Sequence, residues 1–166
     1  MSYDLRGILG PDDVVAEFAR SWLRKPVRLS QRISLLPVTV DLIESVDELV
    51  GKRGTAPFAE FEFLTSSLLQ LITHHSKGHW IVYFENEYFG GTGTQAAALW
   101  RNGELNYGPR LSSTSWDSQN QNDVVDNGWP INEVLRIVGV WTDGGRDEFD
   151  SLELGKYRST EDFNAA

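Results

Sequence analysis

The 166-residue sequence contains no cysteine, only three histidines and no long apolar segment. The absence of thiols excludes disulfides, thiolate metal ligands and cysteine nucleophiles, and it is compatible with a reducing cytosol. The longest apolar runs, WIVYF and AAALW, are far shorter than the roughly 20 residues of a membrane-spanning helix. The first residues, MSYDLRGILGPDD, lack a basic stretch followed by an apolar core. We therefore expect no signal peptide and a cytoplasmic protein without membrane contact.

The composition is typical of a folded protein. Hydrophobic residues make up 40% of the chain and charged residues 23%, which is close to the globular average. The length suits one compact domain, and we find neither an internal repeat nor a linker that would divide it. The sequence therefore predicts a single domain over residues 1–166.

Acidic side chains are concentrated in the last third of the chain. The net charge is −9, and residues 117–163 hold 11 Asp and Glu against 4 Lys and Arg. A surface of this sign repels nucleic acid and anionic lipid, and it attracts basic partners. Acidity also keeps proteins soluble without any further role, so both interpretations stay open at this point.

Four segments have the apolar spacing and the end signals of short helices. They are residues 11–26, 41–50, 65–78 and 130–138. The first is the clearest, because Pro11 suits the first turn, two aspartates follow it, and Pro26 ends it. Its predicted apolar face consists of Val14, Val15, Phe18, Trp22 and Leu23. In the second segment, Asp41 and Glu44 resemble a capping box.

The strand signals describe an antiparallel sheet. Residues 79–86 (HWIVYFEN) are rich in aromatic and β-branched side chains, whereas residues 33–40 contain Pro37 and are typical of an edge strand. Asn102 and Gly103, between QAAALWR and ELNYG, predict a hairpin with a type I′ turn. The expected register pairs Arg101 with Glu104, Trp100 with Leu105 and Ala98 with Tyr107.

Two regions lack a clear element. Residues 58–63 fit either a strand or the first turns of a helix, and residues 109–128 are polar enough to predict a long irregular loop. The tail over residues 142–163 carries several large apolar side chains, so we expect it to dock on the body. The predicted fold class is α+β, with an antiparallel sheet that packs against several short helices.

The stretch FGGTGTQ, residues 89–95, raises the question of a phosphate-binding loop. Such a loop delivers glycines to the N-terminus of a helix. Here the glycines precede QAAALWR, which must be a strand if the Asn-Gly hairpin forms. Neither a following lysine nor the GxGxxG spacing accompanies them. We therefore interpret residues 90–94 as a bent connection between two strands.

The sequence shows no motif for a metal, a cofactor or catalysis. His75 and His79 have the i, i+4 spacing of zinc-binding helices, but no glutamate lies between them and Gly78 is expected to end the helix. There is no GxSxG motif, and the carboxylates of residues 147–150 are typical of a solvated face. We therefore expect no metal, no cofactor and no enzymatic activity.

The six tryptophans fall into two groups. Three lie within predicted elements and are expected in the core: Trp22, Trp80 and Trp100. Three lie in or beside the acidic region: Trp116, Trp129 and Trp141. Aromatic side chains among carboxylates are typical of protein-binding hot spots. Packing beneath a long loop is the structural alternative for each of the second group.

The chain resembles small bacterial immunity proteins, which neutralise toxins of polymorphic or contact-dependent systems, in two stretches: YFGGTGTQAAALWRNGEL and PINEVLRIVGVWTDGGRDEFDSLELGKYRSTEDF. The resemblance covers about residues 80–163, roughly half of the chain, and carries no defined motif position by position. It implies a cytosolic, non-enzymatic α+β protein that binds a toxin domain tightly. Acidic inhibitors of basic nuclease toxins are common in this class.

The leading hypothesis is an immunity-type inhibitor that binds a cognate, basic toxin domain and blocks it by steric and electrostatic occlusion. The surface expected to bind this partner consists of Trp116, Asp117, Asp123, Asp126, Trp141, Asp143, Asp147, Glu148 and Asp150. One alternative is a small hydrolase with its site near the glycine bend at 90–94 and the 109–128 segment. Another is an accessory subunit of a larger assembly.

Overall fold

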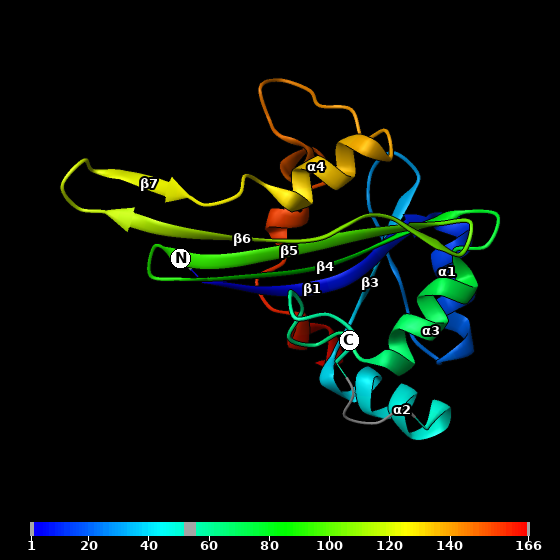
Figure 1. Cartoon of the computed structure of the whole chain (residues 1–166). Coiled ribbons are helices and arrows are strands. Elements are labelled where there is room, and N and C mark those ends of the chain that lie inside the picture. The colour runs from blue at the N-terminus through cyan, green and yellow to red at the C-terminus, as the bar shows by residue number, and fades with distance from the viewer. Residues whose placement is uncertain (1, 52–55, 166) are drawn as a thin grey trace.

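The computed structural model describes residues 2–51 and 56–165. Within these residues, seven strands form one sheet in the order β2-β3-β1-β4-β5-β6-β7, and all neighbouring strands are antiparallel (Figure 1). The strands are β1 (Tyr3–Pro11), β2 (Val27–Arg28), β3 (Ile33–Pro37), β4 (Trp80–Phe89), β5 (Thr92–Arg101), β6 (Glu104–Asp117) and β7 (Asn122–Val125). The helices are α1 (Asp12–Ser21), α2 (Val40–Val50), α3 (Ser66–His75), α4 (Pro130–Ile137) and α5 (Glu148–Ser151), with the 3-10 helices η1 (Leu154–Lys156) and η2 (Thr160–Ala165). The α+β fold class is confirmed.

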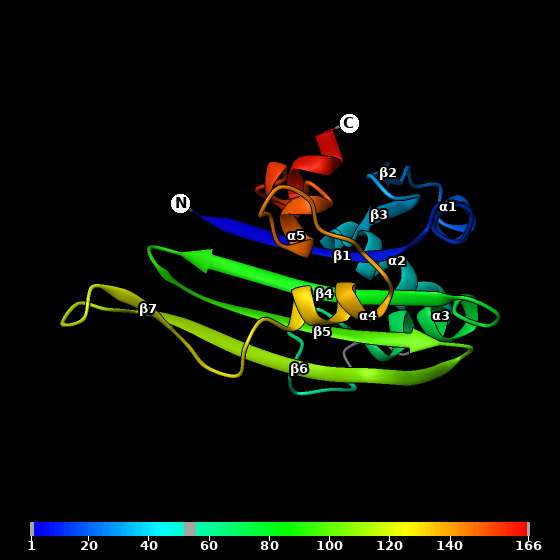
Figure 2. The ribbon, with the colours of Figure 1, turned by 90° about the horizontal axis from the view of Figure 1, so that it is seen from above.

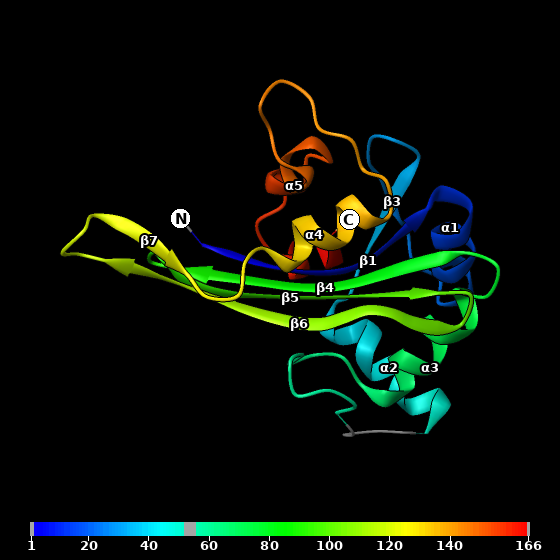
Figure 3. The ribbon, with the colours of Figure 1, turned by 45° about the horizontal axis from the view of Figure 1, so that its top comes forward.

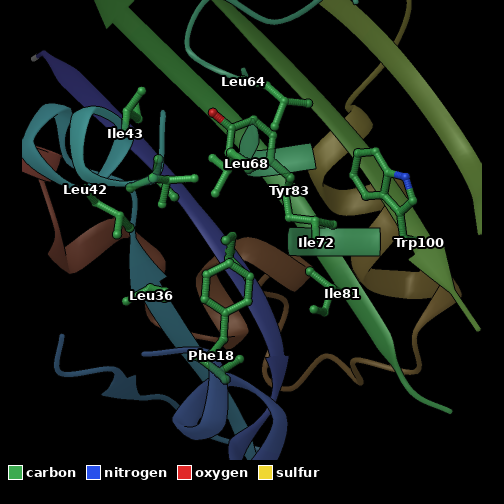
Figure 4. Packing of buried hydrophobic residues seen from close by; sticks show 14 of the residues in the cluster. Phe18, Leu36, Leu42, Ile43, Leu64, Leu68, Ile72, Ile81, Tyr83 and Trp100 are labelled. Carbon is green, nitrogen blue, oxygen red and sulfur yellow. The ribbon is translucent and has the colours of Figure 1, made fainter. Parts of the chain in front are cut away.

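Helices cover both faces of the sheet (Figure 1, Figure 2). Successive side chains along a strand point to opposite faces, so the sheet contributes to two cores. The first core lies between the sheet and helices α1, α2 and α3, and it includes Phe18, Leu36, Leu42, Tyr83 and Trp100 (Figure 4). The second lies between the sheet, α4, α5 and the C-terminal segment, and it includes Leu5, Phe84, Leu99, Leu135 and Leu152. The predicted docking of the tail is thus confirmed.

The sequence pattern did not indicate β1, which lies between β3 and β4 in the middle of the sheet. Most of its residues are buried on both faces, so the alternation of apolar and polar side chains is absent. Gly7 allows close packing, because a Cβ there would come within 2.4 Å of the Leu35 side chain. The Asp4 N–H donates to the Arg158 carbonyl oxygen at 2.9 Å, which holds the C-terminal segment beside this strand.

The prediction that residues 33–40 form an edge strand is wrong. The short strand β2 pairs outside β3, so β3 has a neighbour on each side. Pro37 is the last residue of β3 and lies beyond Ser34 and Leu35, the two residues that pair with β2, so its missing N–H interrupts no pairing with β2.

The hairpin between β5 and β6 forms at Asn102 and Gly103 as predicted. The pairs of Arg101 with Glu104 and of Trp100 with Leu105 are confirmed. The third predicted pair is wrong, because Tyr107 lies opposite Leu99 and not opposite Ala98. A register shift between Leu99 and Trp100 inserts an extra residue into β6. This shift turns the Tyr107 side chain to the face of the second core.

Most of residues 109–128 belong to a β-hairpin formed by β6 and β7, so the prediction of an irregular loop is wrong. Strand β6 runs on to Asp117, a turn follows, and β7 pairs back along it. The tip of this hairpin lies beyond the turn that joins β4 to β5, where none of the described helices covers the sheet (Figure 1, Figure 3). Its side chains are mostly exposed on both faces, and this hides the strand period from the sequence.

All four predicted helices form, and α2 ends at Gly51 as expected. Helix α3 ends at His75, before the predicted end near Gly78. Two details of the other helices also differ from the predictions. Helix α1 ends at Ser21, so Leu23 lies beyond it with a positive φ and 90% of its surface exposed, instead of in the core. Helix α2 is capped by the Thr39 hydroxyl, which accepts a backbone hydrogen bond from the first turn, and not by Asp41.

Residues 58–63 are neither helix nor strand. They belong to a loop that the Glu85 carboxylate holds against the sheet by accepting hydrogen bonds from the N–H groups of residues 62–64 at 2.8–3.2 Å. The buried Tyr83 hydroxyl donates to the same carboxylate at 2.8 Å. Burial raises the pKa of Glu85 above its ordinary value, and the hydrogen bonds oppose this effect in part.

Candidate functional site

The exposed end of the sheet carries four of the residues predicted to bind a partner. Trp116 stands on β6 opposite Asp123 on β7, and 53% of the tryptophan surface is exposed. Asp117 is the last residue of β6, and Asp126 follows β7. The hairpin that carries them projects beyond the neighbouring strands (Figure 2). An exposed tryptophan among three carboxylates therefore lies at an extremity of the protein.

Hydrogen bonds fix the conformation of the hairpin tip. The Asp117 carboxylate accepts from the Asn120 side chain at 2.7 Å and from the Gln119 N–H at 2.9 Å. These contacts lower the pKa of Asp117, and the Asn120 amide is the largest cause. Asp117 therefore shapes the turn, whereas the side chains of Asp123 and Asp126 form no hydrogen bond or ion pair with any described residue.

The base of the hairpin is attached to α4. The Arg110 guanidinium forms an ion pair with the Glu133 carboxylate, which also accepts a hydrogen bond from the Tyr107 hydroxyl at 2.6 Å. Burial, together with this contact, raises the pKa of Tyr107 to about 12. Arg110 also donates to the backbone and side-chain oxygens of Asn127, at 3.0 and 2.8 Å. These contacts fix the direction in which the hairpin leaves the body.

A pocket of about 340 Å³ lies beneath α4 and α5, beside the hairpin, and is called the α4–α5 pocket below. Its floor includes Asn86 of β4 and Gln95 of β5, which are buried and lie directly opposite each other in the sheet. Three carboxylates line it: Asp123 comes from β7, whereas Asp147 is the N-cap of α5 and Asp150 lies within α5. Four lining rings accompany them: Tyr3, Tyr88, Trp129 and Phe149. The fold thus brings a hairpin carboxylate together with two of the predicted C-terminal residues.

Asp147 has a structural role at the rim of this pocket. One of its oxygens caps α5 by accepting the Asp150 N–H at 2.9 Å, and the other accepts a hydrogen bond from the Asn132 side chain at 3.1 Å. The Asp150 side chain, by contrast, is exposed and forms no ion pair with the described residues. Asp150 is therefore the freer of the two to contact a partner.

Glu148 does not belong to the exposed surface, which corrects the sequence-based expectation. Only 6% of this residue is exposed, because α5 turns its side chain inward. Its carboxylate accepts a hydrogen bond from Arg136 at 2.8 Å, and this pairing raises the pKa of Arg136. Glu148 therefore holds α5 against α4.

Trp141 and Asp143 lie in the segment after α4, apart from the hairpin. The Trp141 N–H donates to Gln31 at 3.0 Å, and the Gln31 amide donates back to the Trp141 carbonyl oxygen at 2.9 Å. Gln31 lies between β2 and β3, whereas β7 forms the opposite edge of the sheet. The predicted surface is therefore divided. Six of its residues gather around the hairpin and the pocket: Trp116, Asp117, Asp123, Asp126, Asp147 and Asp150.

The glycine stretch connects two strands, as interpreted from the sequence. Gly90 and Gly91 form the turn between β4 and β5, with φ of +62° and +87°. Gly93 lies within β5, where a Cβ would come within 2.4 Å of the Glu87 carbonyl oxygen. Because a strand follows these glycines, their amides do not stand at a helix N-terminus, which is what a phosphate-binding loop requires.

His75 packs at the end of α3, whereas His74 and His79 are exposed. The ring centroids of His75 and Phe18 are 4.6 Å apart, and burial lowers the pKa of His75. Helix α3 ends at His75, so His79 lies outside it. Over the described ranges, no group of three or more His, Asp or Glu side chains is placed to hold a metal ion.

A second cavity, of about 360 Å³, lies between the loop at residues 59–63 and the other face of the sheet. It contains Arg6 and Glu85, which are both held by other groups of the protein. Arg6 forms an ion pair with Asp4 at 3.0 Å and lies over the Phe63 ring, 3.8 Å from its centroid. Glu85 accepts the backbone and tyrosine hydrogen bonds described above. These charges therefore serve the structure of this end of the sheet.

Sequence reasoning missed the residues that form the floor of the α4–α5 pocket. Gln95 directly precedes the apolar run AAALW in β5, and Asn86 follows the run IVYF in β4 after Glu85. An amide side chain next to or near the end of an apolar run is the signal that was available. Tyr3 was missed because β1 itself was not predicted.

No protein-family model matches the chain, and searches among curated proteins and solved structures found no match either. None of the helices in residues 2–51 and 56–165 is long and apolar enough to cross a membrane. The function is therefore inferred from the geometry of the hairpin and of the α4–α5 pocket.

Proposed function

We propose that the protein is an immunity-type inhibitor that binds a basic toxin domain in the cytoplasm and blocks it by occlusion. The proposed binding surface comprises the tip of the β6–β7 hairpin and the rim of the α4–α5 pocket. The exposure of Trp116 beside carboxylates, on a hairpin fixed to the body, carries the proposal. Inhibition by occlusion needs no catalytic step.

A tryptophan on a hydrogen-bonded hairpin is a suitable anchor for a partner. Its ring offers a large apolar area, and a backbone that is already ordered loses little entropy on binding. Trp129, at the start of α4, is a second exposed tryptophan and lies at the neighbouring pocket. The exposed carboxylates of Asp123 and Asp126 supply the attraction that speeds association with a basic protein.

The partner can be captured from the native cells with this chain as bait, at low and at high salt. We expect one basic, toxin-like protein, retained by the wild type and released by the double variant Asp123→Asn/Asp126→Asn. The matched control is Glu44→Gln/Glu48→Gln, which also removes two exposed carboxylates but on α2, and it should retain the partner. Recovery of no partner at either salt, or equal release by both variants, would contradict the proposal.

The role of the anchor is tested by Trp116→Ala. Truncation of a hot-spot residue costs at least about 2 kcal/mol, which corresponds to an affinity about 30-fold weaker. Leu49→Ala on α2 is the control, because Leu49 is also large, apolar and exposed. Calorimetric titration with the captured partner measures both affinities. Equal affinity of Trp116→Ala and the wild type would place Trp116 outside the interface.

A further inference from the structure

We infer that the α4–α5 pocket receives an arginine side chain of the basic partner. The identity of the occupant rests on the proposed function, whereas the pocket can be tested without the partner. Three features of the pocket favour a guanidinium group: an unpaired buried acceptor, an acidic rim and aromatic walls.

The unpaired acceptor is the side-chain oxygen of Asn86. Only 8% of this residue is exposed, and its Oδ1 accepts no hydrogen bond from any residue that the structure describes. The opposite amide, Gln95, accepts a hydrogen bond from the Ile131 N–H at 3.1 Å. A buried acceptor without a donor is unfavourable, and such groups are rare in native proteins. Because this oxygen has almost no accessible surface, a ligand donor would satisfy it once the Asn86 amide turned toward the pocket.

The charge of the rim selects a cation. Asp123, Asp147 and Asp150 line the pocket, and neither lysine nor arginine occurs among its described lining residues. Asp123 and Asp150 form no ion pair within the described part of the chain. Carboxylates without a counter-charge attract positive groups and repel carboxylates and phosphates. The occupant is therefore a hydrogen-bond donor that carries positive charge.

The rings of Trp129 and Phe149 favour arginine over lysine. A guanidinium stacks on aromatic faces and offers five donors in one plane, whereas the lysine ammonium is compact and more strongly hydrated. The same end of the protein already holds one such contact, since the Arg158 guanidinium lies 4.4 Å from the centroid of the Tyr3 ring. The volume of about 340 Å³ is near the lower limit for ligand pockets and suits a single side chain.

Nuclear magnetic resonance with small probes tests the pocket directly. N-acetyl-arginine amide is titrated into the isotopically labelled full chain. We expect saturable shifts of the side-chain amides of Asn86 and Gln95 and of the Trp129 indole, with a Kd of about 1–10 mM for a ligand of this size. The matched neutral probe, N-acetyl-citrulline amide, has nearly the same shape without the charge. It should bind at least about tenfold more weakly.

Substitutions in the pocket test the contributions of the acceptor and of the acidic rim to probe binding. Asn86→Leu removes the acceptor and should weaken binding of the arginine probe at least about tenfold, while the protein stays folded because the lost amide had an unpaired oxygen. Asp150→Asn should weaken binding at least about threefold, and this exposed change leaves the fold intact. Asp143→Asn, which is exposed and outside the pocket, should bind the probe as the wild type does.

The outcomes distinguish this inference from the proposed function. Absence of saturable shifts, or equal binding of the arginine and citrulline probes, would overturn the inference even where a basic partner is captured. Arginine binding with the expected pattern of variants would support a guanidinium site. If the arginine probe bound in this way but the capture experiment recovered no basic protein, the proposed function alone would be overturned.

Discussion

Replacement of Glu85 by alanine is expected to destabilise the protein strongly, because this carboxylate satisfies a buried hydroxyl and holds a loop. Tyr83 is fully buried, and loss of its acceptor leaves a hydroxyl unpaired at a cost of about 1–3 kcal/mol. The N–H groups of residues 62–64 lose their acceptor too, although they can turn to water. Removal of a buried charge offsets part of this loss. We expect the free energy of unfolding to fall by about 2–4 kcal/mol.

Equilibrium denaturation in urea measures this change. Glu85→Gln keeps one acceptor oxygen, so it should lose only about 1 kcal/mol. The double variant Tyr83→Phe/Glu85→Ala removes the unpaired hydroxyl and should recover about 1 kcal/mol relative to Glu85→Ala. A Glu85→Ala protein within about 0.5 kcal/mol of the wild type would refute the role assigned to this carboxylate.

The same side chain makes stability depend on pH. Burial raises the pKa of Glu85 above 4.5, so the folded state binds this proton more tightly than the unfolded state does. The stabilisation that the folded state gains from this proton is therefore fully present below the unfolded pKa of Glu85. It is lost as the pH rises through the folded pKa. As the pH rises from the unfolded to the raised folded-state pKa of Glu85, the wild type should lose stability relative to Glu85→Gln. A constant difference over this range would contradict the raised pKa.

Two further predictions concern the hairpin and the glycine turn. Glu133→Gln removes the ion pair with Arg110 and should lower the free energy of unfolding by about 1 kcal/mol, with faster amide hydrogen exchange in β6 and β7. Unchanged exchange there would show that this pair does not fix the hairpin. Gly93→Ala places a methyl group 2.4 Å from the Glu87 carbonyl oxygen and should cost about 1–3 kcal/mol in urea denaturation. A cost near zero would disprove the close approach.

Sequence reasoning succeeded where local chemistry decides the structure. Asn102 and Gly103 supply the positive φ angles of a hairpin turn, so the turn and its first pairs were predictable. Most of β1 is buried on both faces, and the tip of the β6–β7 hairpin is exposed on both. The strand period is visible only where one face is buried and the other solvated, so both elements escaped detection.

The candidate site was predictable only in part. Acidity and tryptophan content placed Trp116 and Asp123 in one predicted surface, and the structure brings them opposite each other on β6 and β7. The pocket was not predictable, because Asn86 and Gln95 meet through the pairing of two strands and helix α4 closes over them from elsewhere in the chain. Glu148 resembles its exposed neighbours in sequence, and only the direction of the short helix α5 buries it.

The salt dependence of affinity for the captured partner tests the proposed binding surface most directly. Calorimetry would compare the wild type, Asp123→Asn/Asp126→Asn and the control Glu44→Gln/Glu48→Gln at low and high salt. We predict that the hairpin variant binds at least about tenfold more weakly at low salt and that its Kd depends less on salt, whereas the control follows the wild type. Identical affinity and salt dependence of the hairpin variant and the wild type would contradict the assignment of this surface.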